Sequence, residues 1–265
     1  MSLFVLPESV IKTNARIKFL PNENGEYVPY EITCFDRLTY VPSGWESNRK
    51  KKSLSRHEVF EDADASAMSD GENKRKSFCR ARNMLFDILL STVELNCFVT
   101  LTCSGEKIDR YDYKKIVKSL SCWLDNRVRR NGLIYVLVPE KHKDGAVHFH
   151  GLMNKEALKL VRAVNPYTKK EMVDDKERPI FNIKDFNLGF TTVIPLSGKN
   201  ARTATAKYCY KYIVKSKGEK VGGRYYLSGG KLGRPKYEYV NRDFDDLSGN
   251  VYSIGRFCRF KKIKL

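Results

Sequence analysis

Three segments of the chain place apolar residues at the spacing of a helix. They span residues 77–95, 111–130 and 201–215. An Asn-Gly pair directly after the second segment is a typical helix stop. The pattern therefore predicts three helices, each with an apolar face for packing against another element.

Runs rich in β-branched and aromatic residues lie before and between these segments. They predict strands at residues 15–20, 30–40, 97–103, 133–142, 146–153 and 190–194. Lys-Asp-Gly separates the fourth and fifth runs and is a hairpin turn signal. From residue 77 onward the order is helix, strand, helix, three strands, helix. This order predicts an α+β fold in which helices cover one central sheet that contains an antiparallel hairpin.

Composition divides the chain into four parts. Residues 1–47 form a mixed N-terminal extension with no assigned function. Residues 48–72 include six acidic residues between positions 58 and 72, and such a segment cannot bury enough apolar surface to order itself, so we expect a flexible linker. Residues 73–220 hold the helix and strand pattern, and residues 221–265 form a basic, Gly-rich C-terminal extension.

Charge and cysteine usage narrow the classes of function. The 49 Lys and Arg residues exceed the 31 Asp and Glu residues and give a net charge of +18, which favours a polyanionic partner such as nucleic acid. The seven cysteines show no Cys-x-x-Cys spacing, which argues against a disulfide framework or a zinc ribbon. No signal peptide pattern and no apolar run of membrane-spanning length occur. We therefore expect a soluble, cytoplasmic protein without membrane contact.

The chain has four histidines, and three of them, His142, His148 and His150, fall within nine residues. In the run Val-His-Phe-His, the alternation of a strand places His148 and His150 on one face and the apolar residues on the other. Two imidazoles placed in this way can share a divalent metal ion. A pair of exposed histidines on a strand is the alternative interpretation.

A carboxylate ligand for this ion follows from the predicted turn. If Lys143-Asp144-Gly145 is a three-residue loop with Gly145 in the left-handed conformation, Glu140 lies opposite His148 on the same face. A two-residue loop would place Glu140 opposite Phe149 instead. The first register predicts a metal site of Glu140 and the two histidines, with His142 as the alternative third ligand. The ion would be Mg²⁺ or Mn²⁺, and imidazole ligands favour Mn²⁺.

Two consecutive copies of Tyr-x-x-Lys occur in the last predicted helix. Tyr208, Lys211, Tyr212 and Lys215 share one helical stripe, whereas Tyr210 points in the opposite direction. A tyrosine can attack a phosphodiester when a metal polarises the phosphoryl oxygens, and an adjacent lysine offsets the charge. The same stripe also occurs as an ordinary surface or nucleic-acid contact.

Taken together, these motifs resemble those of the HUH endonuclease superfamily, in the branch of rolling-circle replication initiators of single-stranded DNA phages and plasmids. The resemblance covers residues 73–217. Phe-Val-Thr-Leu-Thr at 98–102 is similar to the first motif, His-Phe-His at 148–150 to the metal motif, and the tandem Tyr-x-x-Lys at 208–215 to the nucleophile motif. The segment after residue 102 departs from the family in lacking a hydrophobic continuation. No Gly-x-x-x-x-Gly-Lys-Ser/Thr motif occurs, so the fused helicase of some relatives is absent.

The resemblance implies a ferredoxin- or RRM-like antiparallel sheet of about five strands. It implies metal-dependent nicking and rejoining of single-stranded DNA at a replication origin through a 5′-phosphotyrosine. The implied catalytic residues are Tyr208, Tyr212, Lys211 and Lys215, and the implied metal ligands are His148, His150 and Glu140. No small-molecule cofactor is expected, and a host helicase in the bacterial cytoplasm would unwind the DNA.

Two alternatives remain open, and both involve nucleic acid. The first is an HUH transposase or relaxase, which uses the same chemistry. The second is a non-catalytic, RRM-like binding module, whose sheet would expose aromatic residues such as Phe98 for stacking on bases. In either case we expect the basic segments 222–236 and 256–264 to contact the DNA backbone.

Overall fold

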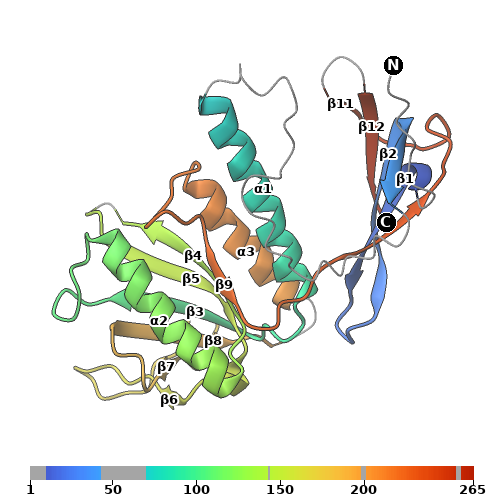
Figure 1. Ribbon diagram of the computed structural model, residues 1–265. Helices are drawn as coiled ribbons and strands as arrows, with labels where there is room; N and C mark the ends of the chain where they lie inside the picture. Colours follow the sequence, from blue (N-terminus) through green and yellow to red (C-terminus); the bar gives the residue numbers. More distant parts are fainter. Residues whose placement is uncertain (1–9, 43–69, 143, 198–200, 255–257) are drawn as a thin grey trace. The chain divides into compact units, whose positions relative to one another are not determined.

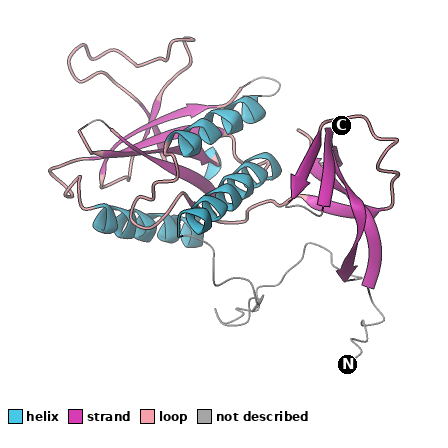
Figure 2. Cartoon of the chain, turned by 90° about the horizontal axis from the view of Figure 1, so that it is seen from above, coloured by secondary structure: helices cyan, strands magenta, loops and turns pink. Residues whose placement is uncertain are grey.

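The computed structural model describes residues 10–42, 70–142, 144–197, 201–254 and 258–265. The chain divides into two compact units, one formed by residues 1–65 together with 234–265 and the other by residues 66–233. Each unit is built on its own antiparallel sheet (Figures 1 and 2). None of the helices in the described residues combines the length and apolarity that crossing a bilayer demands.

The unit of residues 66–233 contains a seven-stranded sheet in the order β6-β7-β8-β3-β5-β4-β9. The four longer strands are β3 (Cys97–Cys103), β4 (Tyr135–Lys141), β5 (Val147–Met153) and β8 (Gly189–Pro195). The short ones are β6 (Leu160–Arg162), β7 (Phe181–Ile183) and β9 (Leu227–Gly229). The α+β prediction, with an antiparallel sheet covered by helices, is confirmed. The sheet exceeds five strands because three-residue strands, too short to show an alternating pattern, extend its edges.

Helix α2 (Tyr113–Asn131) covers one face of this sheet (Figure 1). Its residues Ile116, Leu120 and Leu124 are fully buried in the same core cluster as Val99 and Leu101 of β3. The alternation of β3 sends its odd-numbered positions into this core and its even-numbered positions to the opposite face. The main hydrophobic core therefore lies between α2 and the sheet.

The opposite face carries α1 (Asp70–Ser91) and α3 (Ala201–Lys215), which pack on each other. Helix α3 also contacts β4 and β5. Ala206, Cys209 and Ile213 of α3 are fully buried, and they form the apolar side that the sequence pattern predicted. The face of α3 that carries the two Tyr-x-x-Lys copies is thereby held near the central strands.

The other unit contains a five-stranded sheet in the order β10-β1-β2-β12-β11. Its strands are β1 (Val10–Pro21), β2 (Tyr27–Pro42), β10 (Lys236–Val240), β11 (Val251–Ile254) and β12 (Cys258–Lys264). The sequence treated residues 1–47 and 221–265 as separate extensions, whereas described strands from both pair within this one sheet. The predicted linker, residues 48–72, lies mostly outside the described residues, and its last three residues begin α1.

Strands β4 and β5 approach each other closely at Gly151. A Cβ added to Gly151 would lie 1.9 Å from the carbonyl oxygen of Val136, a backbone atom that cannot move alone. We expect Gly151→Ala to lower the free energy of unfolding in urea by about 2 kcal/mol or more, as overpacking does. The control is Gly71→Ala in α1, where an added Cβ meets nothing within 4 Å, and it should leave stability unchanged or slightly raised. Equal midpoints for the two variants would contradict the prediction.

Candidate active site

The β4–β5 hairpin sets the register of the candidate site. Its loop closes through two backbone hydrogen bonds, from His142 N to the oxygen of Ala146 at 2.8 Å and from Gly145 N to the oxygen of His142 at 2.9 Å. Gly145 has a φ of +85°, the left-handed conformation that glycine adopts without strain. Glu140 consequently pairs with His148. The predicted three-residue loop is confirmed, and the alternative register is excluded.

The two histidines of β5 point away from the main core and are oriented by threonines of β3. Phe149 between them is fully buried, as the alternation predicted. Thr102 Oγ1 lies 3.0 Å from Nδ1 of His148, and Thr100 Oγ1 lies 3.0 Å from Nδ1 of His150. A ring whose Nδ1–H donates to a threonine carries its lone pair on Nε2, the atom then available to a ligand.

Glu140 presents a half-buried carboxylate between two basic partners. Its Oε2 lies 3.0 Å from Nε2 of His150, and its Oε1 accepts a hydrogen bond from Nζ of Lys215. Burial alone would raise the pKa of Glu140, but the hydrogen bond and the charge of Lys215 outweigh it and hold the pKa below its ordinary value. The carboxylate is therefore ionised near neutral pH.

His150 carries a polar atom that the fold leaves without a hydrogen bond. Its Nε2 is buried and has no hydrogen-bond partner in the described residues, although Glu140 Oε2 is near. Burial lowers the pKa of His150 and is also the largest of the causes that lower the pKa of His148. Both imidazoles are thus favoured in the neutral form that binds metals.

This donor set fits a divalent cation in its chemistry. Two neutral imidazoles and a carboxylate are ligands that Mn²⁺ and Mg²⁺ accept, and a cation would satisfy the buried Nε2 of His150. Within the described ranges, however, no three His, Cys, Asp or Glu side chains already stand in the arrangement of an ion site. The oxygens of Glu140 point to Lys215 and His150 instead. His142, the alternative ligand, stacks on His148 with 3.8 Å between ring centroids.

Helix α3 lays both predicted tyrosines over the histidine face. The ring of Tyr212 stacks on His150 with centroids 4.3 Å apart and planes 8° from parallel. Its hydroxyl donates to the hydroxyl of Tyr208 at 2.7 Å. Burial and this hydrogen bond raise the pKa of Tyr212. Tyr208 is 47% exposed and meets Phe98 edge-on at 5.6 Å.

The remaining residues of α3 divide between the site and its surroundings. Lys215 joins the site through Glu140. Lys211 is exposed, and among the described residues no contact joins it to the site. Tyr210 faces the other way, as predicted, and packs edge-on against Phe86 of α1 at 5.3 Å.

Two features of this face were missed in the sequence. The threonines that orient the histidines could have been found, because Thr-Leu-Thr has the same alternation as His-Phe-His. The second feature is Phe190 of β8, which is 72% exposed. It pairs with Thr102, which pairs in turn with His148. An exposed aromatic ring therefore lies on the same row of the sheet as a candidate ligand.

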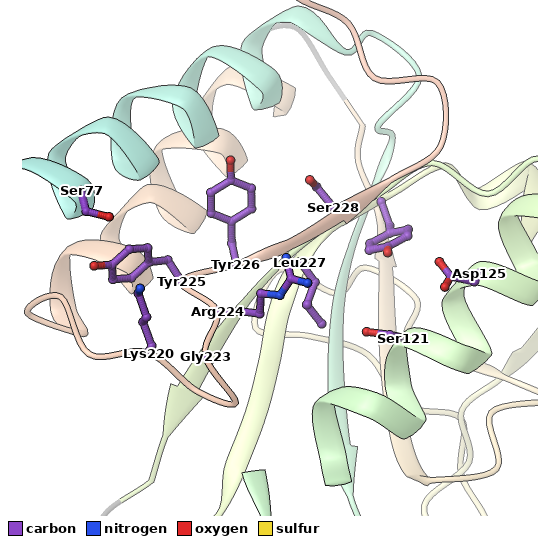
Figure 3. A pocket seen from close by; sticks show the side chains of 11 residues that line it. Ser77, Ser121, Asp125, Lys220, Gly223, Arg224, Tyr225, Tyr226, Leu227 and Ser228 are labelled. Carbon is purple, nitrogen blue, oxygen red and sulfur yellow. The ribbon is translucent and has the colours of Figure 1, made fainter. Parts of the chain in front are cut away.

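A polar cavity of about 560 Å³ lies at the β9 edge of the unit, apart from the candidate catalytic residues (Figure 3). Lys220 and Arg224 line it, together with Asp125 of α2 and the side chains of Tyr225 and Tyr226. Arg224 belongs to the basic segment 222–236 that we expected to contact DNA. The described part of the second basic segment, 256–264, forms β12 in the other unit.

Residues 96–217 match the family model of the replication-associated protein ORF2. Searches of curated proteins and of solved structures gave no match. The matched range contains every candidate ligand and both tyrosines. The chain is therefore similar to replication-associated proteins across its candidate active site, which supports a role in replication initiation and an interaction with DNA.

Proposed function

We propose that this protein is a rolling-circle replication initiator that nicks single-stranded DNA at an origin and holds the new 5′ end on a tyrosine. The observation that carries the proposal is the stacking of Tyr212 on His150, with its hydroxyl on that of Tyr208. This contact unites the tyrosine helix and the histidine strand, two motifs that are far apart in the sequence. Each motif alone is common on protein surfaces.

The ligands for a divalent cation would be Glu140, His148 and His150. Once bound, such an ion, Mg²⁺ or Mn²⁺, polarises the phosphoryl oxygens of the scissile phosphate. Thr100 and Thr102 hold the imidazole rings in place through Nδ1. Outer-shell partners of this kind support the ligands of many metal sites.

The tyrosines supply the nucleophile. A phenolic oxygen attacks the phosphorus, the bond from phosphorus to the 3′ oxygen breaks, and the phenol's proton passes through water to the departing 3′ hydroxyl. The number of ester bonds is unchanged, so the 3′ hydroxyl can later reverse the reaction without a nucleotide cofactor. The ammonium of Lys215, which already contacts Glu140, offsets negative charge on the phosphate or the phenolate.

The surroundings of the site suit a single strand. The net charge of +18 draws a polyanion to the protein. Phe190 is exposed on the same face as the histidines, and stacking of a base on such a ring contributes about 1–3 kcal/mol. A non-catalytic module would use Phe190 in the same way, but it would have no use for a tyrosine held against a histidine pair.

A transposase or relaxase of the same superfamily would use an identical site. The match of residues 96–217 to replication-associated proteins favours the initiator. Covalent chemistry at the tyrosines therefore tests the enzyme class, and replication of a plasmid that carries the cognate origin tests the biological role.

Covalent capture of DNA tests the tyrosines directly. We expect Tyr208→Phe and Tyr212→Phe each to retain an adduct with a single-stranded oligonucleotide, because both hydroxyls reach the same site, and the double variant to form none. Tyr210→Phe, which alters the ring packed on Phe86, is the matched control and should resemble the wild type. The measurement is mass mapping of the DNA-linked peptide. Adducts on one tyrosine only, in wild type and variants alike, would contradict a shared role.

Metal dependence tests the histidines. We expect His148→Ala and His150→Ala each to abolish nicking and to lower Mn²⁺ affinity, measured calorimetrically, by at least about tenfold, the lower end of what loss of a metal-site partner costs. His142→Ala should keep most of both, because the ring of His142 only stacks on His148. Chelation of the metal should stop nicking by the wild type, and added Mn²⁺ should restore it. Equal losses in all three variants would show that His142 is a ligand.

The basic segment 222–236 can be tested by its salt dependence. We expect replacement of Arg224, Lys231, Arg234 and Lys236 by Gln to weaken oligonucleotide binding and to flatten its dependence on salt, by about 0.7 in log–log slope for each lost contact with a single strand. A matched variant replaces four exposed basic residues of α2, Lys114, Lys118, Arg129 and Arg130, and should change the slope less. Mn²⁺ affinity should be unaffected in both, and equal slopes in the two variants would refute the assignment.

A further inference from the structure

A second cavity, of about 710 Å³, opens beside Tyr208. This volume lies within the range of small-molecule sites. Tyr208 is part of its wall, so the cavity adjoins a proposed nucleophile. Neither the histidines nor Glu140 lines it, and it is therefore distinct from the candidate metal site.

The floor of the cavity is apolar and aromatic. Phe98 of β3 and Ile194 of β8 are paired across the sheet and both line it, with Leu196 beyond the end of β8. All three are only partly buried. The ring of Phe98 also meets Tyr208 edge-on at 5.6 Å. A flat heterocycle is the kind of ligand that such a floor accepts by stacking.

One wall is a tight, well-bonded turn. Asp174 Oδ1 accepts hydrogen bonds from the backbone N–H groups of Lys176 at 3.0 Å and Arg178 at 2.8 Å, and its Oδ2 accepts from Nε of Arg178 at 2.8 Å. The backbone of Asp174 also donates to the oxygen of Arg178 at 2.9 Å. These bonds fix the position of Asp175, whose own carboxylate has no hydrogen bond or ion pair within the described residues.

The charge of this wall excludes a phosphate as its preferred ligand. The wall holds two carboxylates, Asp174 and Asp175, and two cations, Lys176 and Arg178. Arg178 is already paired with Asp174. The unpaired carboxylate of Asp175 repels an anion, although the chain as a whole carries a net charge of +18. A neutral ligand with hydrogen-bond donors on its edge fits better.

We propose that this cavity takes one unpaired base of the DNA strand, from a nucleotide next to the phosphate that Tyr208 attacks. The base stacks on Phe98 and donates its exocyclic amino group to Asp175, which selects cytosine, adenine or guanine over thymine. This inference rests on the proposed function for the identity of the strand. It assigns to Asp175 the choice of base at one position of the origin.

The test is a selection from a randomised pool of single-stranded oligonucleotides, with the full chain and with EDTA present so that binding alone is measured. We expect the wild type to enrich an amino-bearing base at one position by about tenfold or more over thymine, as one good base contact can. Asp175→Asn should lose that preference at this position and keep the others. Phe98→Leu should weaken it by removing the stacking ring.

Glu177→Gln is the matched control, because Glu177 is an exposed carboxylate of the same turn that does not line the cavity. It should select the same sequences as the wild type. Identical enrichment by all four proteins, or loss of preference in Glu177→Gln as well, would overturn the proposal. Adduct formation with metal is scored separately: no adduct together with an Asp175-dependent preference would refute the nickase and retain the base site.

Discussion

The register between β4 and β5 is the constraint on which the rest of the candidate site depends. A shift of one residue would exchange the two faces of β5 and turn both histidines into the main core, where Phe149 now lies fully buried. The left-handed conformation of Gly145 closes the three-residue loop that fixes this register. The same register puts Glu140 beside His148. The local geometry of one turn therefore decides whether three polar side chains can act together.

Glu140 also ties the tyrosine helix to the sheet. A half-buried carboxylate loses hydration, and leaving it unpaired would destabilise the fold. In this structure Lys215 of α3 supplies the compensating charge. On the proposed function, a cation bound at Glu140 would take over that role and release the ammonium of Lys215 toward the DNA phosphate. The contact that stabilises the protein without metal thus holds a catalytic lysine close to its place of action.

The sequence was sufficient for the parts of the site that local patterns encode. The strand alternation of His148 and His150, the turn at Gly145 and the stripe of α3 each depend on residues a few positions apart. The five-stranded sheet was not predictable in this way, because it pairs Ala15 with Val240, and no periodicity relates strands so far apart. The cavity beside Tyr208 was missed for the same reason, since β3, β8, α3 and the turn at residues 174–178 meet only in the folded chain.

The two tyrosines are equivalent in the sequence but not in the structure. Tyr212 is half-buried against His150 and donates its proton to Tyr208, which is 47% exposed. On the proposed function, attack by Tyr212 requires this proton to leave, and the hydrogen bond already directs it to an oxygen in contact with solvent. Tyr208 has no such donor relationship to Tyr212 and loses its proton to water directly. The pair is therefore suited to two successive cuts, in which each hydroxyl assists or makes way for the other.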